Sequence, residues 1–193
     1  MSYSSYPEFS WDGYFWGTSA NLPSWVGFQS RNGPYGAISS AEKSSGIIKI
    51  VFAPEGRDGS ELNDSEKALV NWVVENEKEI HDSLIKLLFK LYPSIKVALS
   101  ESDEDTLVSL SEINAPIDIK SIVGVVSINV HQIEKGGIPY VGVELGCDWD
   151  EEHGAGVLFY GAEPLEVGGA DTAVLLWLAK KYANQSFPDS PGK

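Results

Sequence analysis

The sequence has little cysteine and few basic residues, and each shortage excludes a class of protein. Among its 193 residues there is one cysteine, Cys147, so no disulfide can form within the chain. Fourteen Lys and Arg residues stand against twenty-eight Asp and Glu residues, which gives a formal net charge of −14. A chain this acidic is repelled by nucleic-acid phosphates and by anionic membrane surfaces. We therefore expect no nucleic acid or membrane as partner, and we expect a basic protein instead.

Long apolar runs are also missing. No stretch approaches the roughly 20 apolar residues that cross a bilayer, and no basic cluster followed by an apolar run marks a secretory signal. Together with the single cysteine, these absences predict a cytoplasmic protein. No linker or repeat divides the chain, and 42% of its residues are hydrophobic, which suffices for a core. We expect one domain over residues 1–183 and a frayed tail over 184–193.

What the sequence does have is an N-terminal region, residues 9–36, that is rich in aromatic and turn-forming residues. Asp12-Gly13 lies between two aromatic runs, which is a strong signal for a β-hairpin. So many aromatic side chains are untypical of a disordered segment. We expect those of Trp25, Phe28 and Tyr35, with the tryptophans nearer the terminus, to fold against the main body.

The middle of the chain predicts one strand and one long helix. Residues 47–53 read as the strand, and residues 64–94 repeat apolar side chains at helical spacing. Asp64 is the expected N-cap and Pro93 the expected end. Asn76 interrupts the apolar stripe, which indicates a bend or an uncovered patch. An acidic loop over 100–106 and a short helix over 106–113 are expected to follow.

The C-terminal half predicts a sheet and a last helix. Residues 121–149 read as two strands joined by the turn 134–137, and further strands are expected over 156–160 and 165–167. Strands joined by tight turns are antiparallel. The last helix is expected from about Asp171 to Tyr182. The fold class predicted is α+β: an antiparallel β-meander sheet packed by one long helix and a C-terminal helix, with an aromatic-rich N-terminal hairpin region.

The most unusual stretch is the acidic run from Asp148 to His153. We place residues 150–154 in a five-residue hairpin loop that Gly154 closes. Carboxylate and imidazole groups are ligands for divalent cations, so Asp148, Asp150, Glu152 and His153 are candidate metal ligands. The run matches neither a calcium-binding EF-hand loop nor the HExxH zinc motif. Two alternatives stay open: a solvated acidic tip, and acid–base chemistry by His153 oriented by Asp150 or Glu152.

Four other side chains invite a functional interpretation, and each also has a simpler one. His131 is expected at the surface or rim of the sheet, and His81 on a solvated face of the long helix. Cys147 alternates with apolar residues on its strand, so it is expected to behave as a small buried hydrophobe. Arg31, in a cluster of turn residues, is expected to anchor a loop.

Two motifs of this chain resemble those of an uncharacterised bacterial family that is described only as a domain of unknown function. The motifs are LPSWVGFQSRNGPYG, from residue 22, and CDWDEEHGAGV, from residue 147. The resemblance extends from about Trp11 to Tyr182. It implies a compact single-domain bacterial protein and supplies no catalytic activity. Small acidic α+β proteins are often immunity-like or regulatory binding proteins, which is an analogy of fold and charge.

Two hypotheses about function follow. The first is a non-catalytic binding module of immunity-like or regulatory type, whose acidic surface meets a basic protein. The second is a metal-dependent enzyme or metal-binding protein that uses the 148–153 cluster, with a divalent cation as its only cofactor. Because the sequence shows no catalytic constellation, the first is preferred, and the oligomeric state is left open.

Overall fold

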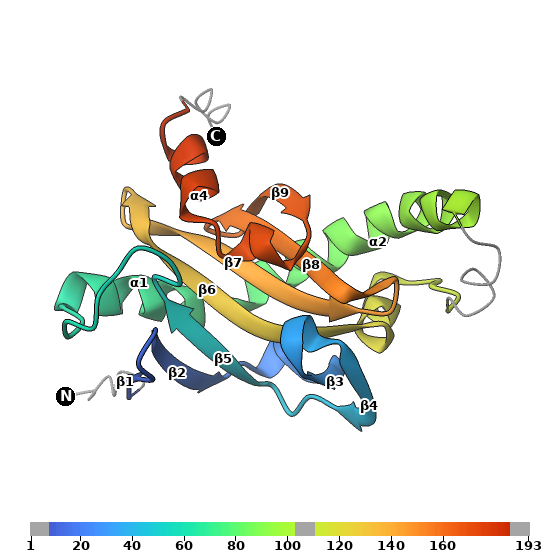
Figure 1. Ribbon diagram of the computed structural model, residues 1–193, viewed down its shortest axis with the longest axis horizontal. Helices are drawn as coiled ribbons and strands as arrows, with labels where there is room; N and C mark the ends of the chain where they lie inside the picture. Colours follow the sequence, from blue (N-terminus) through green and yellow to red (C-terminus); the bar gives the residue numbers. More distant parts are fainter. Residues whose placement is uncertain (1–7, 103–110, 186–193) are drawn as a thin grey trace.

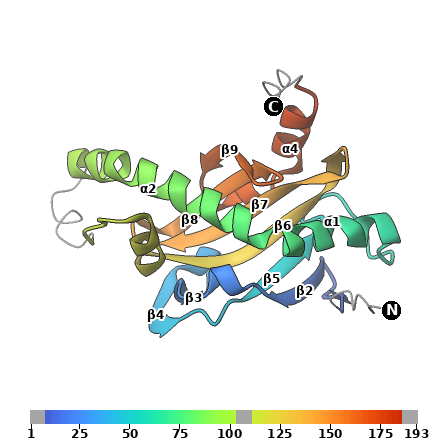
Figure 2. The same ribbon diagram turned by 180° about the vertical axis from the view of Figure 1, so that it is seen from behind.

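A computed structural model describes residues 8–102 and 111–185. Seven strands form one sheet in the order β1-β2-β5-β6-β7-β8-β9, and β3 and β4 form a separate two-stranded ribbon. Helices α1 and α2 cover one face of the sheet, and the short helix η4 and helix α4 lie on the other (Figures 1 and 2). The strands are β1 (Ser10–Trp11), β2 (Trp16–Asn21), β3 (Gln29–Asn32), β4 (Ile38–Lys43), β5 (Ile47–Phe52), β6 (Val123–Lys135), β7 (Ile138–Cys147), β8 (Asp150–Tyr160) and β9 (Glu163–Gly168). The helices are η1 (Pro23–Trp25), η2 (Pro34–Gly36), α1 (Asp64–Glu75), α2 (Glu77–Ser102), η3 (Pro116–Ser121), η4 (Ala170–Ala173) and α4 (Leu176–Ala183).

The α+β fold class is confirmed, and so is the meander. Strands β6 to β9 follow one another and pair antiparallel, and β1 and β2 form the hairpin expected around Asp12-Gly13. One pair departs from the expectation: β5 lies parallel to β6, with Ile50 opposite Ile128. Because α1 and α2 connect these two strands, the chain returns along the same direction, as a helical crossover requires.

The N-cap of helix α1 is Asn63, one residue before the expected Asp64, so the assignment of Asp64 as N-cap was wrong. The side chain of Asn63 accepts a hydrogen bond from the Glu66 backbone N–H at 3.0 Å, and the Asn63 N–H donates to the Glu66 carboxylate at 2.9 Å. This reciprocal capping box satisfies two of the four free N–H groups of the helix start. Glu66 also pairs with Arg57, whose guanidinium holds the pKa of that carboxyl below its usual range.

The predicted long helix is two helices, with the break at Asn76. The Asn76 side chain donates to the Trp72 carbonyl at 2.7 Å, which ends α1, and α2 starts at Glu77. The prediction that Pro93 ends the helix was wrong, because α2 runs through it to Ser102. After the proline, Lys96 pairs with Glu112, and just before it the hydroxyl of the buried Tyr92 donates to the Ser111 carbonyl at 2.8 Å. These two contacts attach the part of α2 around the proline to residues 111–112.

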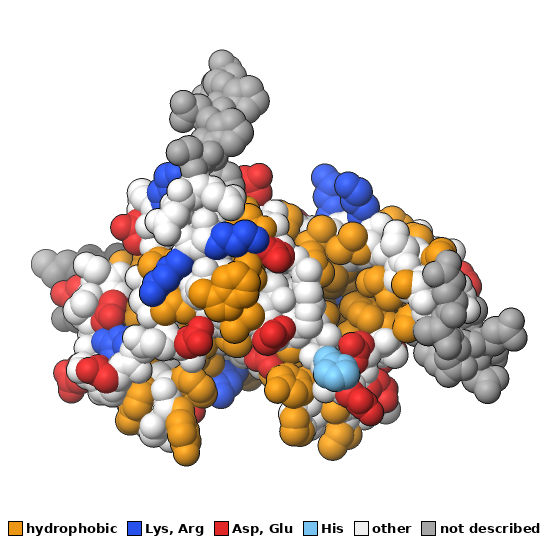
Figure 3. Space-filling model, turned by 45° about the horizontal axis from the view of Figure 1, so that its top comes forward, with side chains coloured by type: hydrophobic (Ala, Val, Ile, Leu, Met, Phe, Trp, Pro, Cys, Tyr) orange, Lys and Arg blue, Asp and Glu red, His pale blue; other side chains and the backbone are white. Residues whose placement is uncertain are grey.

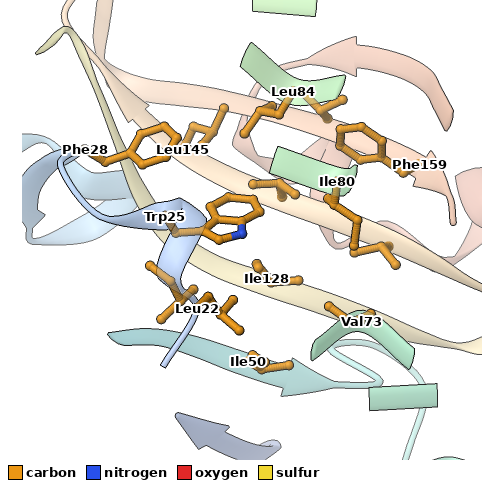
Figure 4. Close-up of a cluster of buried hydrophobic side chains, with 14 of the residues drawn as sticks. Leu22, Trp25, Phe28, Ile50, Val73, Ile80, Leu84, Ile128, Leu145 and Phe159 are labelled. Carbon is orange, nitrogen blue, oxygen red and sulfur yellow. The ribbon is translucent and has the colours of Figure 1, made fainter. Parts of the chain in front are cut away.

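The main core lies between the sheet and helices α1 and α2 (Figure 4). Trp25 and Phe28 are fully buried there and stack with ring centroids 5.8 Å apart, so the expectation for these two aromatics is confirmed. Tyr35 departs from it, because half of its surface stays exposed. On the opposite face, Tyr140 and Leu158 pack under Leu178 and Ala179 of α4.

The last helix begins later than expected. A separate turn, η4, occupies Ala170–Ala173 with Gly169 as its N-cap, and α4 starts only at Leu176. The Leu176 backbone N–H donates to the Glu55 carboxylate at 2.6 Å, so a residue from the loop after β5 satisfies the helix start. Lys180 and Lys181 occupy the last turn of α4, as expected.

Several expectations fall largely outside the described residues. Most of the short helix expected over 106–113 lies there, as do residues 103–106 of the acidic loop and residues 186–193 of the tail. Within the described part, α2 continues to Ser102 where the loop was expected to start. No helix in the described ranges is long and apolar enough to cross a membrane.

Candidate functional site

The acidic run does not form the hairpin loop that was expected. The turn between β7 and β8 consists of Asp148 and Trp149 alone, and β8 already begins at Asp150. Leu145 pairs with Ala155 and Cys147 pairs with Asp150, so Gly146 alone faces the four residues 151–154. Residues 151–154 therefore form a wide bulge in β8, which we call the acidic bulge. A bulge interrupts the regular pairing of a strand and re-aims its side chains.

The acidic bulge depends on glycine at two positions, Gly146 and Gly154. Gly154 has φ of 64°, in the left-handed region that other residues avoid. A Cβ atom on Gly154 would lie 2.5 Å from the Leu145 carbonyl oxygen, and one on Gly146 would lie 2.4 Å from the Gly36 carbonyl oxygen. The η2 turn is thus packed directly onto the β7–β8 corner. Any side chain at either glycine would force the backbone apart.

A buried arginine fastens this corner to the β3–β4 ribbon. The side chain of Arg31 is 0% exposed and forms an ion pair with Asp148, whose side chain is 29% exposed. Arg31 also donates to the Gly36 carbonyl at 3.0 Å and to the Gln29 side chain at 2.7 Å. Gln29 in turn donates to the Asp148 carboxylate at 3.2 Å. The expectation that Arg31 anchors a loop is confirmed, and the partner that it anchors to is the first carboxylate of the acidic run.

Trp149 packs against the main core, whereas the other carboxylates of the acidic run and His153 lie at the surface. The Asp150 carboxylate accepts from the His153 backbone N–H and contacts the ring Nδ1, both at 3.0 Å, and the His153 side chain is 73% exposed. Glu151 and Glu152 are exposed, and neither takes part in an ion pair within the described residues. Figure 3 shows carboxylate side chains gathered beside a histidine on this face. The bulge thus carries negative charge that no Lys or Arg of the described residues neutralises.

The structure brings together only part of the candidate metal set. Asp150 and His153 are in contact, whereas Asp148 faces Arg31 and Glu152 extends separately into solvent. Over residues 8–102 and 111–185, no group of three or more His, Cys, Asp or Glu side chains is placed to hold a metal ion. A metal site at Asp148, Asp150, Glu152 and His153 stays a prediction.

Adding divalent cations to the metal-free protein tests that prediction. With only two of the four candidate ligands in contact, we expect Ca²⁺, Mg²⁺, Mn²⁺ and Zn²⁺ each to leave the thermal midpoint unchanged. A ligand that binds only the folded state at a hundredfold excess over its dissociation constant adds about 2.7 kcal/mol of stability, which a melt detects easily. A rise with one ion that Asp150→Ala abolishes would contradict our expectation and restore the metal site.

A family model described as a domain of unknown function, DUF6985, matches residues 18–175. The chain belongs to this family. The DUF6985 match contains the ribbon with Arg31, the turn with Asp148 and the acidic bulge, and it ends before α4 (Leu176–Ala183). Comparison with curated proteins and with solved structures gives no significant match. The family membership therefore brings no activity with it.

Two histidines of the DUF6985 chain lie where sequence reasoning did not expect them. His81 was assigned to a solvated helix face, but it is buried with its ring edge against Trp25 and Phe28, 5.8 and 5.9 Å between centroids. His131 was assigned to the surface or rim of the sheet, but it is 0% exposed. Burial lowers the pKa of both imidazoles, that of His131 to about 4. Both are neutral near pH 7. His131 is shut off from solvent, whereas His81 keeps 7% of its surface exposed and its ring Nδ1 contacts the Asp82 carboxylate at 2.8 Å.

Cys147 is a small buried side chain in the core, as expected. It is buried in the main core, and its thiol contacts the Asp150 carbonyl oxygen at 3.6 Å. Burial raises the pKa of the thiol to about 12, so the thiolate needed for nucleophilic attack does not form near neutral pH.

The sequence reasoning missed a polar row on the sheet face opposite α1 and α2. Asn129 donates to the Ser127 hydroxyl at 3.0 Å, and that hydroxyl donates to the Glu144 carboxylate at 2.9 Å. Ser127 and Asn129 are two residues apart on β6, so the alternation of polar with apolar residues was the available signal. Because the Ser127 hydroxyl is engaged by both Asn129 and Glu144, this row of described residues offers no free nucleophile.

Proposed function

We propose that this chain is a non-catalytic binding protein, of regulatory or immunity-like type, that contacts a basic protein through the acidic bulge. The observation that carries the proposal is the pair of exposed carboxylates, Glu151 and Glu152, which no described cation neutralises. Like charges close together repel by on the order of 1 kcal/mol when solvated. A basic partner is attracted to both carboxylates and also removes the repulsion between them, and both effects favour the complex.

The construction of the bulge supports the same proposal. It depends on a glycine in the left-handed region, a second glycine under the η2 turn, and a buried ion pair beneath it. Irregular backbone held in place by such supports is concentrated at functional sites. A plain two-residue hairpin would join β7 to β8 without any of these features. The supports therefore argue for display of the acidic side chains and not for folding alone.

The backbone of Tyr35, a residue with a half-exposed aromatic side chain, lies beside the acidic bulge. Tyr35 is 50% exposed, its φ is 53°, and its carbonyl oxygen would lie 3.1 Å from a Cβ atom at residue 154. Aromatic residues with a polar tip are enriched among the residues that dominate binding energy at interfaces. In the proposed complex Tyr35 supplies apolar contact, and the carboxylates supply steering and orientation. The net charge of −14 extends that steering over the whole surface. We place this complex in the cytoplasm.

Charge reversal at the bulge tests the proposal. Affinity purification from the native host with the wild-type chain is expected to recover a basic protein at low salt and to lose it at about 0.5 M salt, where screening reaches a few ångströms. The double variant Glu151→Lys with Glu152→Lys is expected to weaken binding of that protein at least about tenfold, because two attractive contacts become repulsive.

A matched control separates the bulge from the overall charge. Glu75 and Glu79 are exposed residues on α1 and α2, far from the β7–β8 corner (Figure 2). The variant Glu75→Lys with Glu79→Lys changes the net charge by the same amount and should keep the partner. Recovery of the same partner by the bulge variant, or equal loss in both variants, would contradict the assignment of the acidic bulge as the contact surface.

A further inference from the structure

A cavity of about 380 Å³ lies at the other end of the molecule from the acidic bulge. Its lining residues come from the β1–β2 hairpin region and the start of α1, elements that lie on the lower left of Figure 1, whereas the β7–β8 corner lies on the right. Ligand sites in proteins commonly have volumes of roughly 300–1,000 Å³ and combine apolar walls with a few polar groups. This cavity has both properties.

The apolar wall of the cavity is aromatic. Phe9 and Trp16 line it together with Leu62, and both aromatic side chains are partly buried against the main core. Trp16 is held from the outside by Trp11, with 5.8 Å between ring centroids, and Trp11 in turn packs on Gly59. The indole of Trp16 is therefore a fixed surface on which a ligand can stack.

The polar groups of the cavity are mostly carboxylates. Glu8, Glu61 and Asp64 line it, against one cation, Lys67. None of these four forms an ion pair within the described residues, so the three carboxylates remain available. An aromatic wall beside unpaired carboxylates attracts a cation twice, through the ring face and through the opposite charge.

We propose that this cavity binds an arginine residue of a basic peptide. The planar guanidinium stacks on the indole of Trp16 and donates in a fork to a carboxylate, and the methylene stem lies along Phe9 and Leu62. Lysine fits less well, because its compact ammonium is more strongly hydrated and has no planar face. The site is separate from the acidic bulge, so the inference does not depend on the proposed function.

Calorimetric titration of the full chain with three blocked amino acids tests the inference. The probes are the N-acetyl N-methylamides of arginine, lysine and norleucine, which share the stem and differ in the cationic group. We expect binding in the order arginine, lysine, norleucine, with each step several-fold weaker. Equal affinity for the norleucine and arginine derivatives, or no heat at millimolar arginine derivative, would overturn the proposal.

Neutral variants locate the binding. Glu61→Gln with Asp64→Asn keeps the shape of the wall and is expected to weaken the arginine derivative about tenfold. Glu75→Gln with Glu79→Gln removes the same charge elsewhere and should leave the affinity unchanged. A thermal melt of each variant shows whether it is folded, and Trp16→Phe, which keeps an aromatic wall, offers a second test with a smaller loss. Unchanged affinity in the folded Glu61→Gln with Asp64→Asn variant would overturn the assignment of this cavity.

Discussion

Replacing Asp148 with alanine is expected to lower the free energy of unfolding by about 3 kcal/mol, measured by urea denaturation near neutral pH. The reason is the burial of Arg31, whose side chain is 0% exposed and always charged. Without Asp148, that guanidinium keeps its hydrogen bonds to Gly36 and Gln29 but loses its counter-charge. An unpaired buried charge costs several kcal/mol, and the partial exposure of Asp148 places this case at the lower end of the range.

Two comparisons make the interpretation specific. The ion pair of Lys96 with Glu112, whose side chain is 81% exposed, is the control, and Glu112→Ala should cost about 0.5 kcal/mol or less. The double variant Arg31→Met with Asp148→Leu removes both charges and should recover most of the stability lost in Asp148→Ala. A loss for Asp148→Ala no larger than for Glu112→Ala would show that the buried pair does not fasten the corner.

Acidification is expected to destabilise the protein through His131. The pKa of its imidazole is about 4 in the folded chain because burial disfavours the charged form, and it is about 6.5 in an unfolded chain. The Ala173 backbone and, to a smaller extent, the nearby Glu55 carboxylate favour the charged imidazole, but together they offset the burial only in part. Below about pH 6.5 the imidazole of His131 is protonated in the unfolded chain, whereas in the folded chain it is protonated only below about pH 4.

The sign and size of this effect follow directly. Stability from His131 is fully present above about pH 6.5, falls as the pH drops, and levels off below about pH 4 after a loss of about 3 kcal/mol. About 2 kcal/mol of that is lost by about pH 5. His81 also destabilises the folded chain as the pH falls, because burial lowers the pKa of its imidazole as well.

Urea denaturation of wild type and His131→Leu at about pH 7.5 and about pH 5 isolates the contribution. The wild type should lose about 2 kcal/mol more than the variant between the two values. His81 and all carboxylates are common to both chains, so they cancel in the comparison. Parallel losses in the two proteins would show that His131 is not the group that titrates.

The sequence by itself determined most elements and the way in which they connect. Alternation of apolar and polar residues marked β6 and β7, Glu134-Lys135-Gly136-Gly137 marked the turn between them, and Asp12-Gly13 marked the first hairpin. The apolar stripe of α1 and α2, and its interruption at Asn76, were also readable. These features are local: a few neighbouring residues determine each one, through side-chain period or turn conformation.

Only the tertiary structure decided the features that depend on residues far apart in the chain. Arg31 meets Asp148 across 117 positions, and Glu55 caps α4 across 121 positions. His81 and His131 look polar in sequence, yet aromatic rings or the covering chain remove them from water.

The acidic bulge is the clearest case of this division. Its carboxylates were visible in the sequence as a cluster, but their assignment to a loop was wrong. Their separation into one partly buried anchor, Asp148, and an outward group on the bulge depends on Gly146 lying under the η2 turn. That contact joins two segments that are far apart in the chain, at Gly36 and Gly146. Composition and spacing do not encode such a contact, because it is determined only when the sheet and the β3–β4 ribbon pack together.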